Sequence, residues 1–244
     1  ITKKTRAFIF NSPSNPTGTV YEKSEIEKIA KVFEGTDVLV LSDEIYEKLI
    51  YSNQGFSSFA SFSKDAYERT ITVNGFSKAY AMTGYRLGYA AGPKEIIAAM
   101  TLIQGQSTSN ATSVVQKAAI RALSLPDSDL KPMVDSFARR RLTMAEIFSQ
   151  CKKCSFVVPD GAFYFFLNVE RLLGATYNIE EKSKSLLTSE DLAFFLLEQA
   201  QVVTVPGGGF GAPNFLRLSF AVSDADIVEG SQRIVKIFDS LQKI

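Results

Sequence analysis

The chain has 244 residues, enough for one large domain or two smaller ones with a substantial core. Hydrophobic residues make up 45% of it and the formal net charge is +1, so charge gives no reason to expect a nucleic acid or an anionic membrane as partner. No run of residues is long and apolar enough to span a bilayer. Histidine is absent, which excludes Ser-His-Asp and Cys-His catalysis and every histidine-ligated metal site within this sequence.

Predicted elements in the first half alternate between short apolar strands and amphipathic helices. The strands are expected at 7–10, 38–41, 70–73 and 87–91, and a helix at 22–33. Continuous apolar strands separated by helices indicate a sheet buried on both faces, and therefore an α/β fold. Ligands of such sheets gather at the carboxyl ends of the strands.

A long helix is predicted from Asp127 to about Gln150, and long helices often bridge two domains. We therefore expect one domain over residues 1–126 and a smaller α+β domain over residues 127–244. The smaller domain is expected to hold strands near 156–158, 163–168, 202–204 and 215–220, helices at 190–200 and after Ser223, and an exposed loop at 175–187.

The helix at 190–200 carries a start signal in its own sequence. Ser189 or Thr188 is the expected N-cap, and Asp191 completes a Thr-x-x-Asp capping box with Thr188. A box of this kind satisfies backbone N–H groups at the start of a helix, so we expect the helix to begin at these residues.

Two cysteines, Cys151 and Cys154, are the only ones in the sequence. They are too few for a disulfide framework, so a cytosolic, reducing compartment is the default expectation. Their spacing resembles half of a zinc site, but no second pair and no histidine accompany it. We expect no metal, and the chemistry must rest on Lys, Tyr, Asp, Arg and a cofactor.

Lys78 lies in the stretch Asn-Gly-Phe-Ser-Lys-Ala-Tyr that follows the strand at 70–73. A lysine among small, aromatic and hydroxyl residues loses hydration, and its amine becomes easier to deprotonate and can attack a carbonyl. Arg86, eight residues downstream, can hold a phosphate. Together the two residues suggest a cofactor bound as a Schiff base.

Two further polar segments follow predicted strands. The loop at 11–18 contains two X-Pro steps and ends in glycine; it is either an ordinary turn or a rigid support that fixes the amide of Asn15 toward a ligand. Asp43 ends the second strand, with Tyr46 three residues on. The aspartate is either a helix N-cap or a partner for a cationic ring nitrogen.

These motifs, in this order, resemble the pyridoxal-phosphate-dependent class I and II aminotransferases of fold type I, and within them the bacterial-type aspartate aminotransferases. The resemblance runs along nearly the whole chain. It is carried by Asn15 in Asn-Pro-Thr-Gly, Asp43-x-x-Tyr46, Ser77-Lys78 with Arg86, and Arg217 in Phe-Leu-Arg-Leu-Ser-Phe.

The resemblance implies catalytic roles for Lys78, Asp43 and Tyr46. Lys78 would bind the aldehyde of pyridoxal 5'-phosphate and later shuttle a proton between the substrate and the cofactor. Asp43 would keep the pyridine nitrogen protonated, so that the ring accepts electrons. Tyr46 would hydrogen-bond the phenolic oxygen of the ring.

The same resemblance implies the binding residues. Asn15 would join Tyr46 at the phenolic oxygen and also face the substrate, and Ser77 and Arg86 would complete the cofactor-binding set, with Arg86 on the phosphate. Arg217 would grip the substrate α-carboxylate in a bidentate fork that a lysine could not reproduce.

Fold, activity and assembly also follow from the resemblance. Residues 1–126 would be part of the large, mainly parallel-sheet cofactor domain, and the active sites would lie at the boundary of a cytoplasmic homodimer. The enzyme would transfer an amino group from an L-amino acid to a 2-oxo acid. Aspartate with 2-oxoglutarate is favoured, and aromatic amino acids, alanine and prephenate stay open because the 103–110 region holds no arginine for a side-chain carboxylate.

Two features depart from the family pattern. Members carry a long portion before the Asn-Pro-Thr-Gly strand, so the chain resembles the C-terminal part of such an enzyme, and a truncated chain would bind the cofactor poorly and be inactive alone. Gly75 stands where some members have a phosphate-binding serine, which shifts that contact to Arg86. The run Gly207–Gly211 is interpreted as a flexible connection, since no lysine or helix follows it as in a phosphate loop.

Three other functions are compatible with these motifs. A carbon–sulfur lyase or a synthase on the same scaffold would use Lys78, Asp43 and Arg217 without needing an oxo-acid acceptor. A regulator domain similar to aminotransferases would bind without catalysis. A bare α/β module without cofactor would require the four motifs to coincide by accident.

Overall fold

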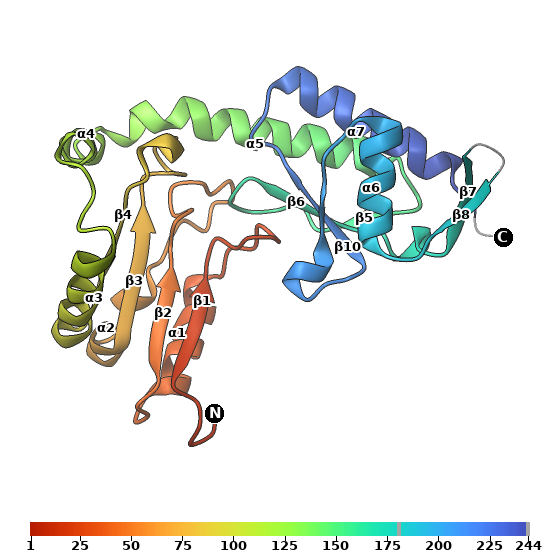
Figure 1. Ribbon diagram of the computed structural model, residues 1–244. Helices are drawn as coiled ribbons and strands as arrows, with labels where there is room; N and C mark the ends of the chain where they lie inside the picture. The colour runs from red at the N-terminus through yellow and green to blue at the C-terminus, as the bar shows by residue number, and fades with distance from the viewer. Residues whose placement is uncertain (180–181, 243–244) are drawn as a thin grey trace. The chain divides into compact units, whose positions relative to one another are not determined.

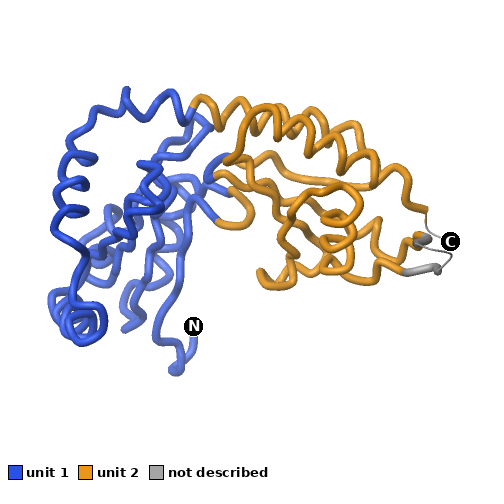
Figure 2. Tube along the Cα trace, turned by 45° about the horizontal axis from the view of Figure 1, so that its top comes forward, with its two compact units in different colours: residues 1–14, 19–134, 160–162 blue, residues 15–18, 135–159, 163–244 orange. Residues whose placement is uncertain are grey.

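The chain forms two compact units, shown in different colours in Figure 2. The computed structural model describes residues 1–179 and 182–242. Unit 1 comprises residues 1–14, 19–134 and 160–162, and unit 2 comprises residues 15–18, 135–159 and 163–244. The boundary between the two compact units thus falls inside the long helix, whereas the domain boundary expected after residue 126 stays a prediction.

The sheet of unit 1 is mixed and mainly parallel. Its strands are ordered β1-β2-β3-β4, in which β1, β2 and β3 run parallel and β4 is antiparallel to β3. The carboxyl ends of the three parallel strands therefore meet at one edge (Figure 1), and the expected α/β class is confirmed. The strands span Ala7–Asn11 (β1), Leu39–Asp43 (β2), Thr70–Gly75 (β3) and Gly88–Ala91 (β4).

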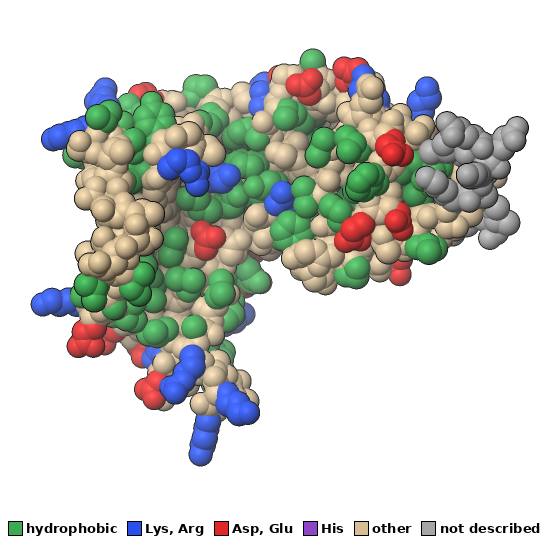
Figure 3. Space-filling view, in the orientation of Figure 1, with side chains coloured by type: hydrophobic (Ala, Val, Ile, Leu, Met, Phe, Trp, Pro, Cys, Tyr) green, Lys and Arg blue, Asp and Glu red, His purple; other side chains and the backbone are tan. Residues whose placement is uncertain are grey.

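Helix α1 covers one face of this sheet because it presents an apolar stripe. Ile26, Ala30 and Phe33 are buried against Phe10 and Val40 of the neighbouring strands. Figure 3 shows hydrophobic side chains gathered on the viewer's side over the strands. Within β1, Ile9 is 70% exposed. The helices of unit 1 are α1 (Lys23–Phe33), α2 (Lys64–Arg69), α3 (Lys94–Ser107) and α4 (Ser113–Leu123).

The long helix α5 spans Asp127–Ser149, as the sequence predicts. In unit 2 it lies against an antiparallel sheet ordered β5-β6-β10-β9, and Phe148 of the helix meets Phe165 of the sheet with ring centroids 5.8 Å apart. The strands span Ser155–Phe156 (β5), Tyr164–Asn168 (β6), Val205–Pro206 (β9) and Phe215–Ser219 (β10). No strand forms at 202–204, where one is expected. Residues 201–204 connect the end of the preceding helix to β9, which begins at Val205.

Helices α6 (Ser189–Ala200) and α7 (Asp224–Ser240) complete unit 2 and contact each other. The predicted capping box is confirmed: the Asp191 N–H donates to Thr188 Oγ1 at 3.1 Å, and the Thr188 N–H donates to Asp191 Oδ2 at 2.9 Å. Ser223 caps α7 through a single bond of this kind, in which its Oγ accepts the N–H of Asp226 at 3.1 Å. No helix in the described ranges 1–179 and 182–242 is long and apolar enough to cross a membrane.

The prediction of an exposed loop at 175–187 is wrong. This segment contains an antiparallel pair of strands, β7 (Ala175–Ile179) and β8 (Lys182–Leu186). Ala175 and Leu186 face each other in the pair and are buried, and the ring of Tyr177 lies 4.1 Å from that of Phe195 in α6. A few apolar contacts therefore hold this mainly polar hairpin in place. The polar average of the segment conceals these contacts when only the sequence is considered.

Candidate active site

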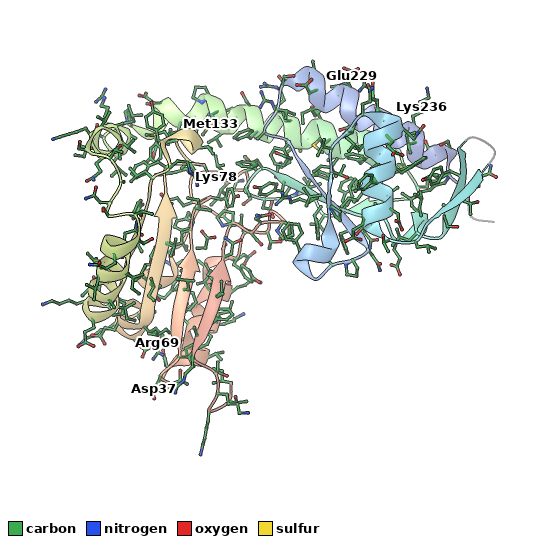
Figure 4. The ribbon with its side chains drawn as sticks, viewed as in Figure 1. Asp37, Arg69, Lys78, Met133, Glu229 and Lys236 are labelled. Atoms are coloured by element: carbon green, nitrogen blue, oxygen red, sulfur yellow. The ribbon has the colours of Figure 1, made fainter. Side chains whose placement is uncertain are left out.

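Lys78 lies just beyond the carboxyl end of β3, at the edge of the sheet where the parallel strands end (Figure 4). It belongs to a loop that is closed at its base, because the Phe76 N–H donates to the Leu87 carbonyl at 3.2 Å. The side chain is half-buried, and its Nζ lies 6.0 Å from the centroid of the Tyr46 ring. The fold thus brings Lys78 and Tyr46 together across two neighbouring strand ends.

Asp43 is the last residue of β2 and pairs in register with Asn11 of β1 and Val73 of β3. Its carboxylate accepts the Ile45 N–H at 3.2 Å, and its carbonyl accepts the Asn11 amide at 3.1 Å. Burial raises the pKa of Asp43, and the bond from Ile45 opposes this shift only in part. A carboxylate in this setting favours a cationic partner, since pairing restores the charge stabilisation lost with water.

Glu44, between Asp43 and Tyr46, is a buried support that cannot be recognised from the sequence motif alone. Its exposure is 4%, and its Oε1 accepts hydrogen bonds from Ser42 Oγ at 2.9 Å, Ser58 Oγ at 2.8 Å and the Phe59 N–H at 3.3 Å. Burial raises the pKa of Glu44 despite these donors. The bonds tie the turn after β2 to residues 58–59 and so fix the backbone that carries Asp43 and Tyr46.

Ser77 and Arg86 lie on the same loop as Lys78, at its two ends. The Ser77 carbonyl accepts the Thr83 hydroxyl at 2.9 Å, and Arg86 Nη1 donates to the Thr83 carbonyl at 3.1 Å. Arg86 has a left-handed backbone with φ of 53°, an unfavourable conformation for a residue with a side chain. Its exposed guanidinium lines a cavity of about 800 Å³ with Gln104, Thr108 and other polar residues of unit 1.

Gly75 ends β3 at a place with little room for a side chain. A Cβ there would lie 3.0 Å from the Gly88 Cα, 3.0 Å from the Leu87 carbonyl oxygen and 3.2 Å from Ile45 Cδ1. A serine would need these neighbours to shift, so the departure from the family pattern at this position agrees with the close approach of β4.

Arg217 and Asn15 are brought together in unit 2, although 202 positions separate them in the sequence. Arg217 Nη1 donates to Asn15 Oδ1 at 2.7 Å, which is the range of a short, charge-assisted hydrogen bond. Arg217 lies in the middle of β10 between Phe166 of β6 and Val205 of β9. Its side chain is half-buried, and its planar fork suits a carboxylate.

Two aromatic rings lie against the Arg217 guanidinium, and no motif in the sequence points to either of them. The guanidinium carbon is 4.3 Å from the centroid of the Tyr164 ring and 5.1 Å from that of Phe210. The aromatic run Phe163–Phe166 was a visible signal, but only the pairing of β6 with β10 shows that Tyr164 meets the arginine.

Gly207–Phe210 forms a tight 3-10 turn rather than the flexible connection that the sequence suggested. A Cβ on Gly207 would lie 2.1 Å from the Ala212 carbonyl oxygen and 2.7 Å from that of Phe215, so only glycine fits there. The cysteine pair is buried, and burial with the neighbouring Cys151 raises the pKa of the Cys154 thiol to about 12. No cluster of potential metal ligands occurs in the described part of the chain.

A family profile described as "Aminotransferase class I and II" matches residues 1–234. The chain belongs to the class I and II aminotransferase family. The probable aspartate/prephenate aminotransferase of Aquifex aeolicus is 41% identical over 243 residues, which are 99% of this chain and 59% of that protein.

Solved structures of aspartate aminotransferases agree with this membership. The enzyme from Rhizobium meliloti has a TM-score of 0.92 and 39% identity, over 99% of this chain and 60% of that one. The Thermus thermophilus enzyme with maleate has a TM-score of 0.84 and 36% identity, over 97% of this chain and 58% of that one. This chain therefore spans about three fifths of the length of the relatives it matches.

Class I and II aminotransferases use pyridoxal phosphate, and the residues at the edge of the unit 1 sheet fit that group chemically. Lys78 offers an amine for its aldehyde, and Arg86 an exposed cation for its phosphate. Asp43 offers a half-buried carboxylate, whose pKa is raised by burial, and a protonated ring nitrogen beside it would restore part of the charge stabilisation lost with water.

Proposed function

We propose that this chain is part of an enzyme that carries out the pyridoxal-phosphate-dependent transfer of an amino group from an L-amino acid, with aspartate favoured, to a 2-oxo acid such as 2-oxoglutarate. The observation that supports it most directly is the placement of Lys78 and Asp43 at the carboxyl ends of adjacent parallel strands, with Tyr46 beside the lysine. Family membership supports the reaction type.

In unit 1 the bound cofactor would supply an electron sink for the carbanion that forms at the substrate α-carbon. Lys78 would hold the aldehyde carbon through Nζ, and as a free amine it would accept the α-proton of the substrate as a general base. Asp43 would keep the ring nitrogen protonated, because its half-buried carboxylate gains from a cation beside it. The Tyr46 hydroxyl would donate to the phenolic oxygen, and Ser77 and Arg86 would hold the phosphate.

In unit 2 Arg217 binds the substrate α-carboxylate. Its Nη1 already donates to Asn15, and the remaining N–H groups of the guanidinium form an edge that can donate two parallel hydrogen bonds. A fixed carboxylate orients the α-carbon, and such orientation lowers the entropy cost of the reaction.

Aspartate is the favoured substrate, because relatives bear the names aspartate aminotransferase and aspartate/prephenate aminotransferase. Because the second of these names also includes prephenate, prephenate is the next candidate for the oxo-acid acceptor. Turnover of aspartate, measured once with 2-oxoglutarate and once with prephenate as the acceptor, decides between the two oxo acids.

A homodimer in the cytoplasm is part of the proposal. Aspartate aminotransferases are typically dimers, and the composition gives no reason to expect nucleic acid or a membrane as partner. Sedimentation of the protein at several concentrations tests the dimer.

A covalent-labelling experiment tests the cofactor site. Pyridoxal phosphate is added to the protein, the visible spectrum is recorded, and borohydride reduction is followed by peptide mass mapping. We expect a band that reduction makes permanent, with the label on Lys78. Lys78→Ala should abolish both, whereas Lys64→Ala, which removes an exposed lysine of the same unit, should change neither. Label spread evenly over other lysines would contradict the site.

Dependence on the acceptor tests the reaction type. A transaminase needs a 2-oxo acid for each turnover, whereas a carbon–sulfur lyase or a synthase would release product without one. Turnover that is unaffected when the oxo acid is withheld would refute transamination and favour the lyase or synthase.

A further inference from the structure

We propose that Tyr164 and Phe210 are positioning residues for carboxylate binding, because their rings brace the Arg217 guanidinium and hold its plane. For the identity of the carboxylate this inference rests on the proposed function; its geometry lies within unit 2 alone. The ligand class is a planar carboxylate that meets the guanidinium at its N–H edge.

The distances are those at which a cation and an aromatic ring attract. The guanidinium carbon lies 4.3 Å from the Tyr164 centroid and 5.1 Å from the Phe210 centroid, both inside the limit of about 6 Å for this interaction. A ring against a guanidinium removes water from its face and leaves the N–H groups in the plane available. The rings therefore leave the N–H edge of the guanidinium as the part of Arg217 that can bind a carboxylate.

Strand pairing and one tight turn bring the two rings to the arginine. Tyr164 opposes Ser219 across β6 and β10, which makes it the diagonal neighbour of Arg217 on the same face. Phe210 ends the 3-10 turn that Gly207 makes possible, and its ring meets Phe166 edge-on with centroids 6.3 Å apart. The brace is thus anchored on the sheet from two directions.

Asn15 supplies the remaining constraint. The rings restrict the tilt of the guanidinium plane, and the 2.7 Å bond from Nη1 to Asn15 restricts its rotation within that plane. An arginine side chain held in this way loses little additional freedom when it binds a carboxylate, so binding is favoured. The arrangement is preorganised for one direction of approach.

The first test observes the brace without any ligand. The Arg217 Nε–H resonance of the full chain is recorded for its ring-current shift and for its rotation about the Nε–Cζ bond. We expect a shifted, slowly rotating group in wild type and in Tyr164→Phe, and an ordinary, fast-rotating one in Tyr164→Leu and Phe210→Leu. Phe156→Leu is the matched control, since Phe156 packs on Phe165 of the same sheet and not on Arg217.

The second test measures carboxylate binding with maleate, the dicarboxylate present in the Thermus relative. Each leucine variant should bind maleate roughly two- to fivefold more weakly than wild type, the range expected when one cation–ring contact is lost. Tyr164→Phe and Phe156→Leu should bind as wild type does. Because Phe210 is 37% exposed, Phe210→Leu should fold even if Tyr164→Leu does not.

Three outcomes overturn the inference, and they separate it from the proposed function. An Arg217 resonance that is the same in wild type and Phe210→Leu shows that the rings do not brace the guanidinium. Equal maleate affinity in wild type and in folded leucine variants removes the positioning role and leaves the proposed function standing. A wild-type protein that shows the brace and fails to bind maleate refutes the carboxylate role together with the proposed function of Arg217.

Discussion

The surroundings of Lys78 and those of Arg217 hold a functional side chain by different means. Near Lys78 the positions come from strand ends and from buried polar bonds, above all the three hydrogen bonds to Glu44. Arg217 lies in the middle of a strand and is surrounded by aromatic rings. The first arrangement suits side chains whose protonation state must be controlled, and the second suits a cation whose orientation must be fixed.

Asp43→Asn should have the largest effect, because under the proposed function it removes the charge that would pair with the ring nitrogen. We expect turnover to fall by roughly 10²- to 10³-fold, the usual loss when a preorganised electrostatic contact of an active site is removed. Steady-state kinetics of the holoenzyme measures the effect. Asp37→Asn, at the opposite end of the sheet in Figure 4, should leave turnover unchanged, and an equal loss in both variants would deny Asp43 its role.

Arg217→Lys should come next. A lysine keeps the charge but not the fork, and we expect kcat/KM for aspartate to fall roughly 10- to 100-fold, mainly through KM. Arg171→Lys provides the control, since this exposed arginine of unit 2 donates to the Lys152 carbonyl. An unchanged KM in Arg217→Lys would show that the carboxylate binds elsewhere.

Gly207→Ala should destabilise unit 2, because its Cβ would lie 2.1 Å from a backbone oxygen. We expect the free energy of unfolding to fall by about 3 kcal/mol, at the upper end of overpacking effects. Gly209→Ala, two residues on in the same turn, meets no atom within 4 Å and should change stability by less than about 0.5 kcal/mol. Similar denaturation midpoints for the two variants would show that the turn can relax.

Glu44→Gln should give the smallest effect, and it depends on pH. Burial raises the folded-state pKa of Glu44 above its ordinary value of 4.5, so its favourable contribution is complete below pH 4.5 and is lost as the pH rises through the raised value. The glutamine variant keeps an acceptor without the charge. We therefore expect it to be at least as stable as wild type near pH 7.

Denaturant unfolding of wild type and Glu44→Gln between pH 4.5 and 8 checks this sign. The difference between them should shrink as the pH falls toward 4.5. Glu198→Gln, which changes an exposed glutamate of α6, should show no such trend. A difference that grows as the pH falls would mean that the three donors outweigh the cost of burial.

Local signals were sufficient for elements with strong periodicity or caps. The long helix, the box at Thr188 and Asp191, and the parallel strands could all be predicted, because their causes lie within a few residues of one another. The hairpin at β7 and β8 could not, because its stability comes from a ring in α6 and from buried ends that only folding brings together.

The sequence by itself determined the family, the α/β class and the set of residues with reactive chemistry, because these depend on residue type and order. Only the tertiary structure decided which of them meet. It paired Arg217 with Asn15 across the chain, placed Tyr164 and Phe210 on its guanidinium, and buried Glu44 behind Asp43. Strand register and burial are collective properties of the packed chain, and no short segment encodes them alone.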